Sequence, residues 1–232
     1  MSLKGLFIGQ AGYNTHIAMR VSPMKSNVIK ASFSGQTNLP PIKRTNKESG
    51  RKREYLEPKE INRLIAAVKN NRHCLRDQLI ILMSYRHGLR VSEVVDLKWE
   101  QVKFDKARLH VNRSKNGEPS VQPINGDELR NLRALKREYP ESAFIFCTNT
   151  EQGYVPLKEN GVFKMIQRAG VTANLPFPVH PHMLRHSCGH LLANKGQDTR
   201  AIQDYLGHRN IQHTVKYTKL AENRFDGFER LF

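Results

Sequence analysis

Acidic residues are scarce in this 232-residue sequence, and none occurs before Glu48. The 21 Asp and Glu stand against 38 Lys and Arg, which gives a formal net charge of +17 at pH 7. Because so basic a chain is typical of proteins that bind polyanions, we expect nucleic acid to be its partner. The shortage of carboxylates also disfavours a reaction that depends on two carboxylate-bound metal ions.

Cysteine and long apolar runs are scarce as well. Cys74, Cys147 and Cys188 are widely spaced and form no Cys-x-x-Cys pair, so neither a disulfide framework nor a thiolate zinc site is expected. No apolar run approaches the length of a membrane span. These absences predict a cytoplasmic protein that has no membrane partner.

Residues 1–54 show no sustained hydrophobic periodicity. They mix Gly, Ser, Asn and Pro with ten Lys or Arg and only two acids. This composition predicts a basic, flexible N-terminal arm that adds phosphate contacts. A linker without a role is an open alternative, whereas the Gly, Pro and Asn content disfavours an organelle transit peptide.

From Pro58 onward, apolar residues recur at helical spacing. Proline in the first turn, Asp198 as a cap and glycines after the last turns indicate where helices begin and end. The expected helices cover residues 58–68, 75–87, 89–97, 127–139, 157–169, 182–195 and 199–206.

Between Val102 and Ile124 the apolar residues recur at every second position, through Val121, and are separated by two turns. This pattern predicts a small antiparallel three-stranded sheet, with Lys115 at the tip of its second hairpin. A further short strand is expected over residues 143–146. The fold class is therefore mainly α (α+β).

The segment from 180 to 217 holds six of the ten histidines. It contains His182-x-x-Arg185, then Leu206-Gly207-His208, then Tyr217 nine residues later. Arginine has a planar fork that binds two phosphate oxygens at once, so Arg185 and Arg90, on separate helices, are candidates to clamp one phosphodiester. Either arginine alone would be read as a surface ion pair.

Tyr217 is the candidate nucleophile. A phenol has an ordinary pKa near 10, and the cationic residues around Tyr217 are expected to favour its phenolate. His182 and His208 are candidates to donate to the phosphate or to accept the phenol proton, and Lys115 is a candidate general acid. The remaining helical tyrosines are expected to be core residues: Tyr85, Tyr139 and Tyr205.

These motifs resemble those of the tyrosine recombinases, also called phage-type integrases. Gly88-Leu89-Arg90-Val91-Ser92-Glu93 is similar to the first arginine box of that family, and His182-Met183-Leu184-Arg185-His186 to its His-x-x-Arg box. Lys115 stands where the family has its hairpin lysine. Within the family, HPHMLRHSCG and IQDYLGHRNIQHTVKYT are most similar to the small inverting recombinases of fimbrial phase variation.

The resemblance covers about residues 54–232 and implies a helical catalytic domain over 55–232. It implies a site-specific recombinase in which Tyr217 attacks a DNA phosphate, leaving a 3′-phosphotyrosyl link and a free 5′-hydroxyl, with no metal or nucleotide cofactor. Lys115 would protonate the leaving oxygen, and Glu93 would orient the site. The phosphate would be held by Arg90, His182, Arg185 and His208.

The resemblance also implies partners. Double-stranded DNA would be bound by a homo-tetramer on paired sites, with accessory DNA-bending proteins, in a nucleoid-associated enzyme that inverts, integrates or excises DNA. Most members carry a helical core-binding domain of about a hundred residues before the catalytic domain. Because only some fifty irregular residues stand there in this sequence, we expect no full core-binding domain and a one-sided DNA clamp.

Three alternatives remain open. A metal site would use the histidines spaced along one helix, His182, His186 and His190, with His180 or Cys188 nearby. A degenerate member of the family would be a regulator that binds DNA without cutting it. A type IB topoisomerase-like enzyme would use the same tyrosine chemistry without a specific site.

Overall fold

The computed structural model describes residues 53–113, 117–221 and 224–226. All of them lie within Lys47–Phe232, the second of two units into which the chain divides. The expected basic arm therefore falls almost entirely outside the described residues, and so does Lys115. The described part is mainly helical with small antiparallel sheets, which confirms the predicted fold class.

Eight α-helices are found in the described residues. Their bounds are α1 Pro58–Ala67, α2 Cys74–Arg86, α3 Val91–Val95, α4 Gly126–Glu138, α5 Glu159–Thr172, α6 Pro181–Asn194, α7 Thr199–Leu206 and α8 Gln212–Lys219. A 3₁₀ turn, η1, covers Trp99–Gln101. Of the α-helices, only α8 was not predicted, because its mostly polar sequence carries a weak apolar pattern.

The helix ends follow local chemistry. Pro58 occupies the first turn of α1, where its missing N–H costs nothing. Asp198 caps α7 by accepting hydrogen bonds from the backbone N–H groups of Arg200 (2.7 Å) and Ala201 (3.0 Å). Gly88 and Gly207 follow α2 and α7 with positive φ angles of 57° and 63°, which favour glycine.

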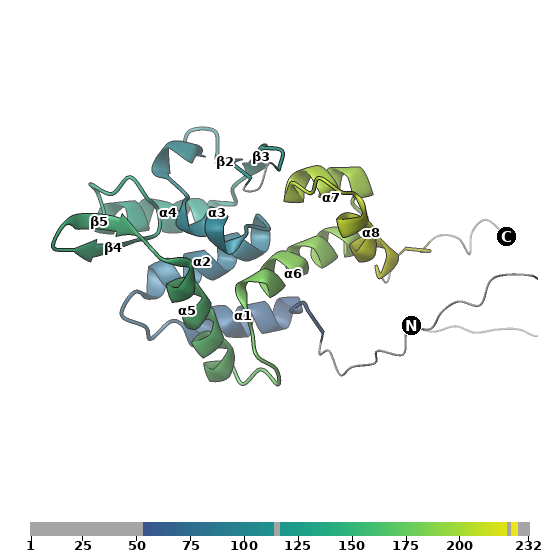
Figure 1. The fold of residues 1–232 in the computed structure, drawn as a ribbon, viewed down its shortest axis with the longest axis horizontal. Helices are drawn as coiled ribbons and strands as arrows, with labels where there is room; N and C mark the ends of the chain where they lie inside the picture. Colours follow the sequence, from purple (N-terminus) through teal and green to yellow (C-terminus); the bar gives the residue numbers. More distant parts are fainter. Residues whose placement is uncertain (1–52, 114–116, 222–223, 227–232) are drawn as a thin grey trace, which may run out of the picture. The chain divides into compact units, whose positions relative to one another are not determined.

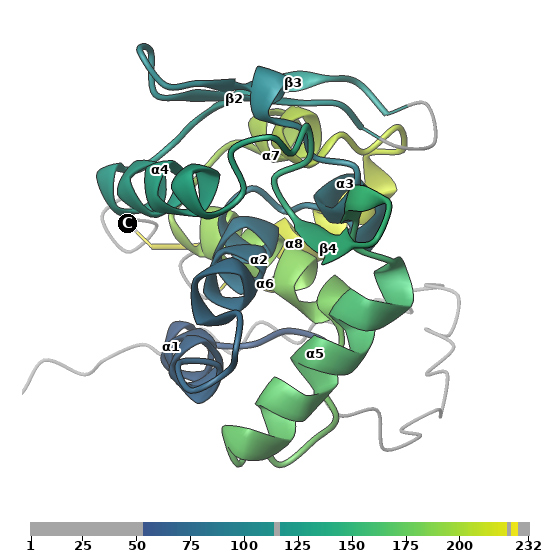
Figure 2. The ribbon, with the colours of Figure 1, turned by 90° about the vertical axis from the view of Figure 1, so that its left-hand side faces the viewer.

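The hydrophobic core is built around α2, which packs against α1, α4 and α6. Leu64, Leu79, Met83, Leu132 and Leu184 are fully buried there. Figure 1 and Figure 2 show α1 and α5 on one side of α2 and α6, and the β2–β3 hairpin with α7 on the other. The loops after α2 and α7 both contact α6, because Arg185 of that helix donates to the carbonyls of Gly88 and Leu206. None of the helices in the described ranges is long and apolar enough to cross a membrane.

The predicted antiparallel three-stranded sheet is present, with the strands in the order β1 Val102–Lys103, β2 Arg108–Val111 and β3 Ser120–Pro123. Val121, one of the alternating apolar residues, is 59% exposed, whereas its polar neighbour Gln122 is buried. The Gln122 side-chain amide reaches His87 Nδ1 and donates to the Tyr205 carbonyl, each at 2.8 Å. Those two partners compensate for burying a polar side chain.

A second sheet was missed. Strands β4 Cys147–Thr150 and β5 Gly153–Pro156 form an antiparallel hairpin. The strand expected over 143–146 is wrong, since Phe144 makes only an isolated bridge with Lys98. The β4 sequence is polar and lacks the alternation by which the other strands were recognised.

Candidate active site

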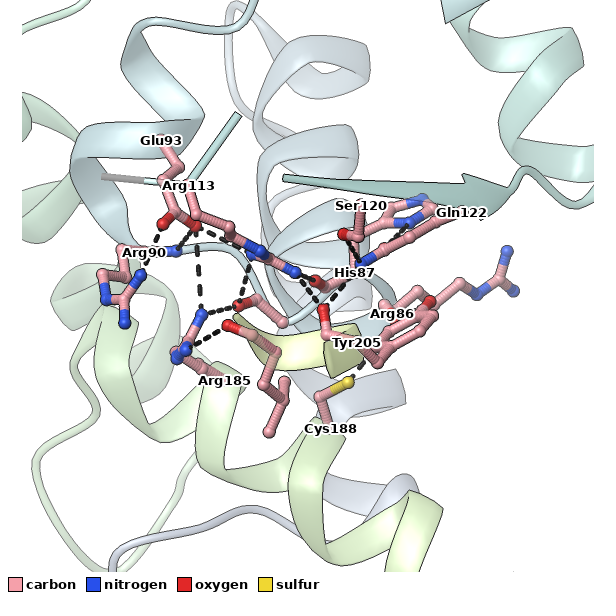
Figure 3. Close-up of polar contacts among 12 residues, drawn as sticks. Arg86, His87, Arg90, Glu93, Arg113, Ser120, Gln122, Arg185, Cys188 and Tyr205 are labelled. Atoms are coloured by element: carbon pink, nitrogen blue, oxygen red, sulfur yellow. Dashed lines mark hydrogen bonds and ion pairs between the residues drawn. The ribbon is translucent and has the colours of Figure 1, made fainter. Parts of the chain in front are cut away.

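Glu93 lies at the centre of a buried polar cluster where α3 begins (Figure 3). The carboxylate accepts hydrogen bonds from the Arg90 backbone N–H (2.9 Å) and the Arg90 side chain (2.7 Å), which closes the first turn of α3. Burial alone would raise the pKa of Glu93, but Arg113, Arg90 and Arg185 together bring it below the ordinary value. Glu93 is therefore an anion at neutral pH that holds three guanidinium groups together.

Arg185 projects from α6 into this cluster and is only 1% exposed. Its guanidinium donates to the Gly88 carbonyl and, at 2.6 Å, to the Leu206 carbonyl, and lies 3.9 Å from Glu93. Burial, with the nearby charges of Arg90 and Arg113, lowers its pKa to about 10, so it stays charged at neutral pH. The two arginines singled out in the sequence therefore share Glu93 between them.

Arg113 was not predicted and is the third guanidinium of the cluster (Figure 3). Its buried side chain donates to Glu93 (2.9 Å), to the His87 carbonyl (3.2 Å) and to the Tyr205 carbonyl. It ties the end of β2 to the loop after α2 and to the end of α7. The sequence carried one signal for it: position 113 continues the buried phase of Leu109 and Val111.

Gly207 makes room for that arginine. A Cβ atom at this position would lie 2.5 Å from the Arg113 Cγ, and the φ angle of +63° disfavours other residues as well. His208 follows directly, and its Nδ1 lies 2.9 Å from the Thr214 hydroxyl. Close packing against Arg113 thus explains the glycine at position 207, and the hydrogen bond to Thr214 orients the ring of His208.

Tyr217 lies on α8 and is 1% exposed. Its hydroxyl is 2.8 Å from Nδ1 of His186, and the His208 ring stacks on it at 6.2 Å between centroids. Burial raises the pKa of Tyr217 to about 12, although Arg185 lowers it. Burial outweighs the cations that were expected to favour the phenolate, so the phenol keeps its proton at neutral pH.

His182 is exposed and turns the edge of its ring toward His186, with the centroids 4.4 Å apart. The tyrosines expected in the core, Tyr85, Tyr139 and Tyr205, are only half-buried. Tyr217 is more deeply buried than they are, which is the reverse of what the sequence suggested. Lys115 cannot be placed, since it lies outside the described residues.

The histidines on α6 do not form a metal centre in the described part of the chain. No three His, Cys, Asp or Glu side chains there are grouped so that they could hold a metal ion. His186 instead directs Nδ1 at Tyr217, and the His190 ring packs edge-on against the same tyrosine at 5.1 Å. Sequence reasoning considered His186 and His190 only as metal ligands.

The Tyr217 ring packs directly against Gly189. A Cβ atom at this position would lie 2.6 Å from Cε2 of that ring. We expect Gly189→Ala to displace Tyr217, to lower the free energy of unfolding by about 1–3 kcal/mol, as overpacking does, and to slow any reaction at the hydroxyl. Urea denaturation and single-turnover kinetics would measure the two effects.

Gly161→Ala is the matched control. Gly161 is also helical, but nothing lies within 4 Å of a Cβ built there. We expect that variant to be as active as the wild type and to gain up to about 1 kcal/mol of stability from helix propensity. Equal stability and activity of Gly189→Ala and Gly161→Ala would contradict the close packing of Tyr217 on α6.

Comparison with known families assigns residues 54–224 to the family described as "Phage integrase family". The chain belongs to the phage integrase family. The recombinase is 40% identical over 182 residues to type 1 fimbriae regulatory protein FimE of Escherichia coli K12, a match that covers 76% of this chain and 90% of FimE. FimB of the same organism is 38% identical over 187 residues, which cover 78% of this chain and 92% of FimB.

Recombinases with longer chains also match. Tyrosine recombinase XerA of Pyrococcus horikoshii is 36% identical over 163 residues, which cover 70% of this chain and 55% of XerA. Among solved structures, that of the XerA recombinase matches with a TM-score of 0.64 at 24% identity and covers 76% of this chain and 64% of that one. The predicted family, its fold and its activity, site-specific recombination by a tyrosine recombinase, are thereby confirmed.

Proposed function

We propose that this recombinase cuts and rejoins double-stranded DNA through Tyr217, and that its product is inversion of a DNA segment. The observation that carries the proposal is the meeting of Arg90, Arg185 and Glu93 in one cluster, with the Tyr217 side chain anchored on the same helix as Arg185. Inversion is what the resemblance to the small inverting recombinases of fimbrial phase variation implies, and the similarity to a type 1 fimbriae regulatory protein over 90% of its length agrees with that resemblance. Double-stranded DNA as partner is supported by solved relatives, one of them titled as XerH recombinase bound to its difH substrate.

Each residue is given one role. Arg90, Arg185, His182 and His208 hold the nonbridging oxygens of the phosphodiester, on which negative charge grows during attack. Buried Glu93 keeps the guanidinium groups in place through its ion pairs with Arg90 and Arg185. Lys115, which lies outside the described residues, serves as the general acid.

The reaction balances without an added energy source. The Tyr217 hydroxyl loses its proton to solvent as its oxygen forms a bond to phosphorus. The bond from phosphorus to the 5′-oxygen breaks, that oxygen takes a proton from Lys115, and solvent returns a proton to the lysine. The phosphotyrosyl link is a phosphodiester that preserves the energy of the broken bond. Attack by a 5′-hydroxyl then reverses the step on the same or another strand.

Assembly and location follow from the same proposal. Strand exchange between two sites requires four active sites, so we assign a homo-tetramer on paired DNA sites. We also propose accessory DNA-bending proteins that help to select the target, because phosphate contacts made by a basic chain carry no sequence information. Such an enzyme works in association with the nucleoid.

The test uses nicked suicide DNA substrates with EDTA present. We expect a covalent protein–DNA adduct on a denaturing gel, a free 5′-hydroxyl on the released strand, and a nucleotide-modified tryptic peptide in which Tyr217 carries the modification. An adduct on another residue, or cleavage that EDTA prevents, would contradict the proposal. Relaxation of any supercoiled plasmid without a specific site would point to a topoisomerase.

A further inference from the structure

The hydroxyl of Tyr217 has a hydrogen-bond partner that the roles above do not use. His186 follows Arg185 on α6 and is 7% exposed, and its Nδ1 lies 2.8 Å from the Tyr217 oxygen. The rings of His190 and His208 pack around the same tyrosine at 5.1 and 6.2 Å. Those two imidazoles contact the ring, whereas His186 holds the oxygen.

The direction of this hydrogen bond follows from the charge states of its two partners. Burial, together with His182 and Lys216, lowers the pKa of His186 to about 3, so its ring is neutral at physiological pH. The pKa of Tyr217 is raised, so the phenol keeps its proton. With both groups neutral, we assign the phenol, which is the stronger acid of the two, as the donor to Nδ1, and this leaves the imidazole proton on Nε2.

The placement of His186 links the two halves of the reaction. Arg185 and His186 are neighbours on one helix, and Arg185 is fixed by the carbonyls of Gly88 and Leu206. A partner on α6 therefore sets the Tyr217 oxygen at a fixed position relative to the guanidinium that receives the phosphate. Position matters here, because an error of about 1 Å in a reacting atom costs on the order of a hundredfold in rate.

We propose that His186 is a positioning residue for DNA cleavage, which orients the Tyr217 hydroxyl toward the phosphate by accepting its hydrogen bond at Nδ1. The inference rests on the proposed role of Tyr217 as the nucleophile. It gives His186 a function distinct from those of His182 and His208, which bind the phosphate. A purely structural role would instead require only that the space be filled.

Three substitutions separate these roles. His186→Asn places an amide oxygen where Nδ1 was, His186→Gln places its amide one bond farther out, and His186→Leu fills the space without an acceptor. In single-turnover cleavage of the suicide substrate, we expect the Asn variant to stay within about tenfold of the wild type and the Leu variant to lose about a hundredfold. We expect the Gln variant to cleave as slowly as the Leu variant, and we expect the DNA affinity of all three variants to stay close to that of the wild type.

His190→Leu is the control, since His190 packs on the same ring and should alter the rate by no more than about threefold. A folded His186→Leu variant that cleaves at the wild-type rate would overturn the inference, and so would equal rates for Asn and Gln. If His186→Leu fails to melt cooperatively, the Asn and Gln pair decides the matter. Failure of the wild type to form any adduct would instead overturn the proposed function.

A spectroscopic measurement on the unaltered site gives independent evidence. The ¹⁵N resonance of His186 Nδ1 should show an accepting nitrogen in the wild type and should shift in Tyr217→Phe. No change between the two proteins would mean that the hydrogen bond is not formed in solution, and the positioning role would fall with it.

Discussion

Tyr217→Phe should form no covalent adduct with DNA on any suicide substrate, because no other group in the variant replaces the missing nucleophilic oxygen. The ring keeps its place on Gly189, and only the hydrogen bond to His186 is lost. An unpaired buried acceptor costs about 1–3 kcal/mol, so we expect the variant to fold. The measurement is adduct formation on a denaturing gel beside DNA affinity, which should be unchanged.

Tyr205→Phe is the matched control for that prediction. Its hydroxyl donates to the Arg86 carbonyl at 2.9 Å, so the substitution also removes one hydrogen bond from a tyrosine in contact with α6 and α2. We expect adduct formation to persist at nearly the wild-type rate. Adduct formation by Tyr217→Phe, or its loss in Tyr205→Phe, would show that the wrong tyrosine has been assigned.

Local sequence rules predicted the frame of the site well. The arginine box begins α3 because the Arg90 backbone and the Glu93 side chain form a capping interaction within four residues. Gly88 and Gly207 end helices with positive φ, as their positions suggested. Motifs of this kind depend on neighbours in the chain and can be recognised without a structure.

The missed features depend on distant contacts. Arg113 is buried because carbonyls from His87 and Tyr205 converge on it, and neither segment is near β2 in sequence. Gln122 turns inward for the same reason, displacing Val121 to the surface. A polar side chain is expected to be exposed until its partners are known, so the sequence pattern alone did not indicate that these two residues are buried.

The same limit applies to Tyr217 itself. The sequence distinguished it by its cationic neighbours and by the resemblance, and placed the other helical tyrosines in the core. In the structure, Tyr217 is the most deeply buried of these tyrosines. Its hydroxyl is hydrogen-bonded to His186, and its ring packs against Gly189. Burial raises the pKa of the phenol and keeps it protonated, which the charges along the chain could not indicate.

Arg185→Lys should slow DNA cleavage by about a hundredfold to a thousandfold, the range seen when one donor to a developing negative charge is removed. The guanidinium binds the carbonyls of Gly88 and Leu206 and still has N–H groups for a phosphate oxygen. A lysine ammonium keeps the charge beside Glu93 but has no planar fork to reach both carbonyls and the phosphate. Single-turnover cleavage on saturating DNA separates this loss from any change in affinity.

Arg86→Lys is the control for the arginine substitution. Arg86 forms a two-pronged pair with Asp127 at 2.7 and 2.8 Å, lies 3.1 Å from buried Glu128, and points away from the cluster (Figure 3). We expect its replacement to alter the cleavage rate less than about threefold, because lysine keeps the positive charge beside Asp127 and Glu128, and neither carboxylate belongs to the Glu93 cluster. If Arg185→Lys were equally mild, Arg90 would have to carry the phosphate alone, and Arg185 would serve only to join the loops after α2 and α7. If Arg185→Lys is severely slowed while its melting temperature stays near that of Arg86→Lys, the loss belongs to the transition state, and the buried guanidinium acts on the phosphate itself.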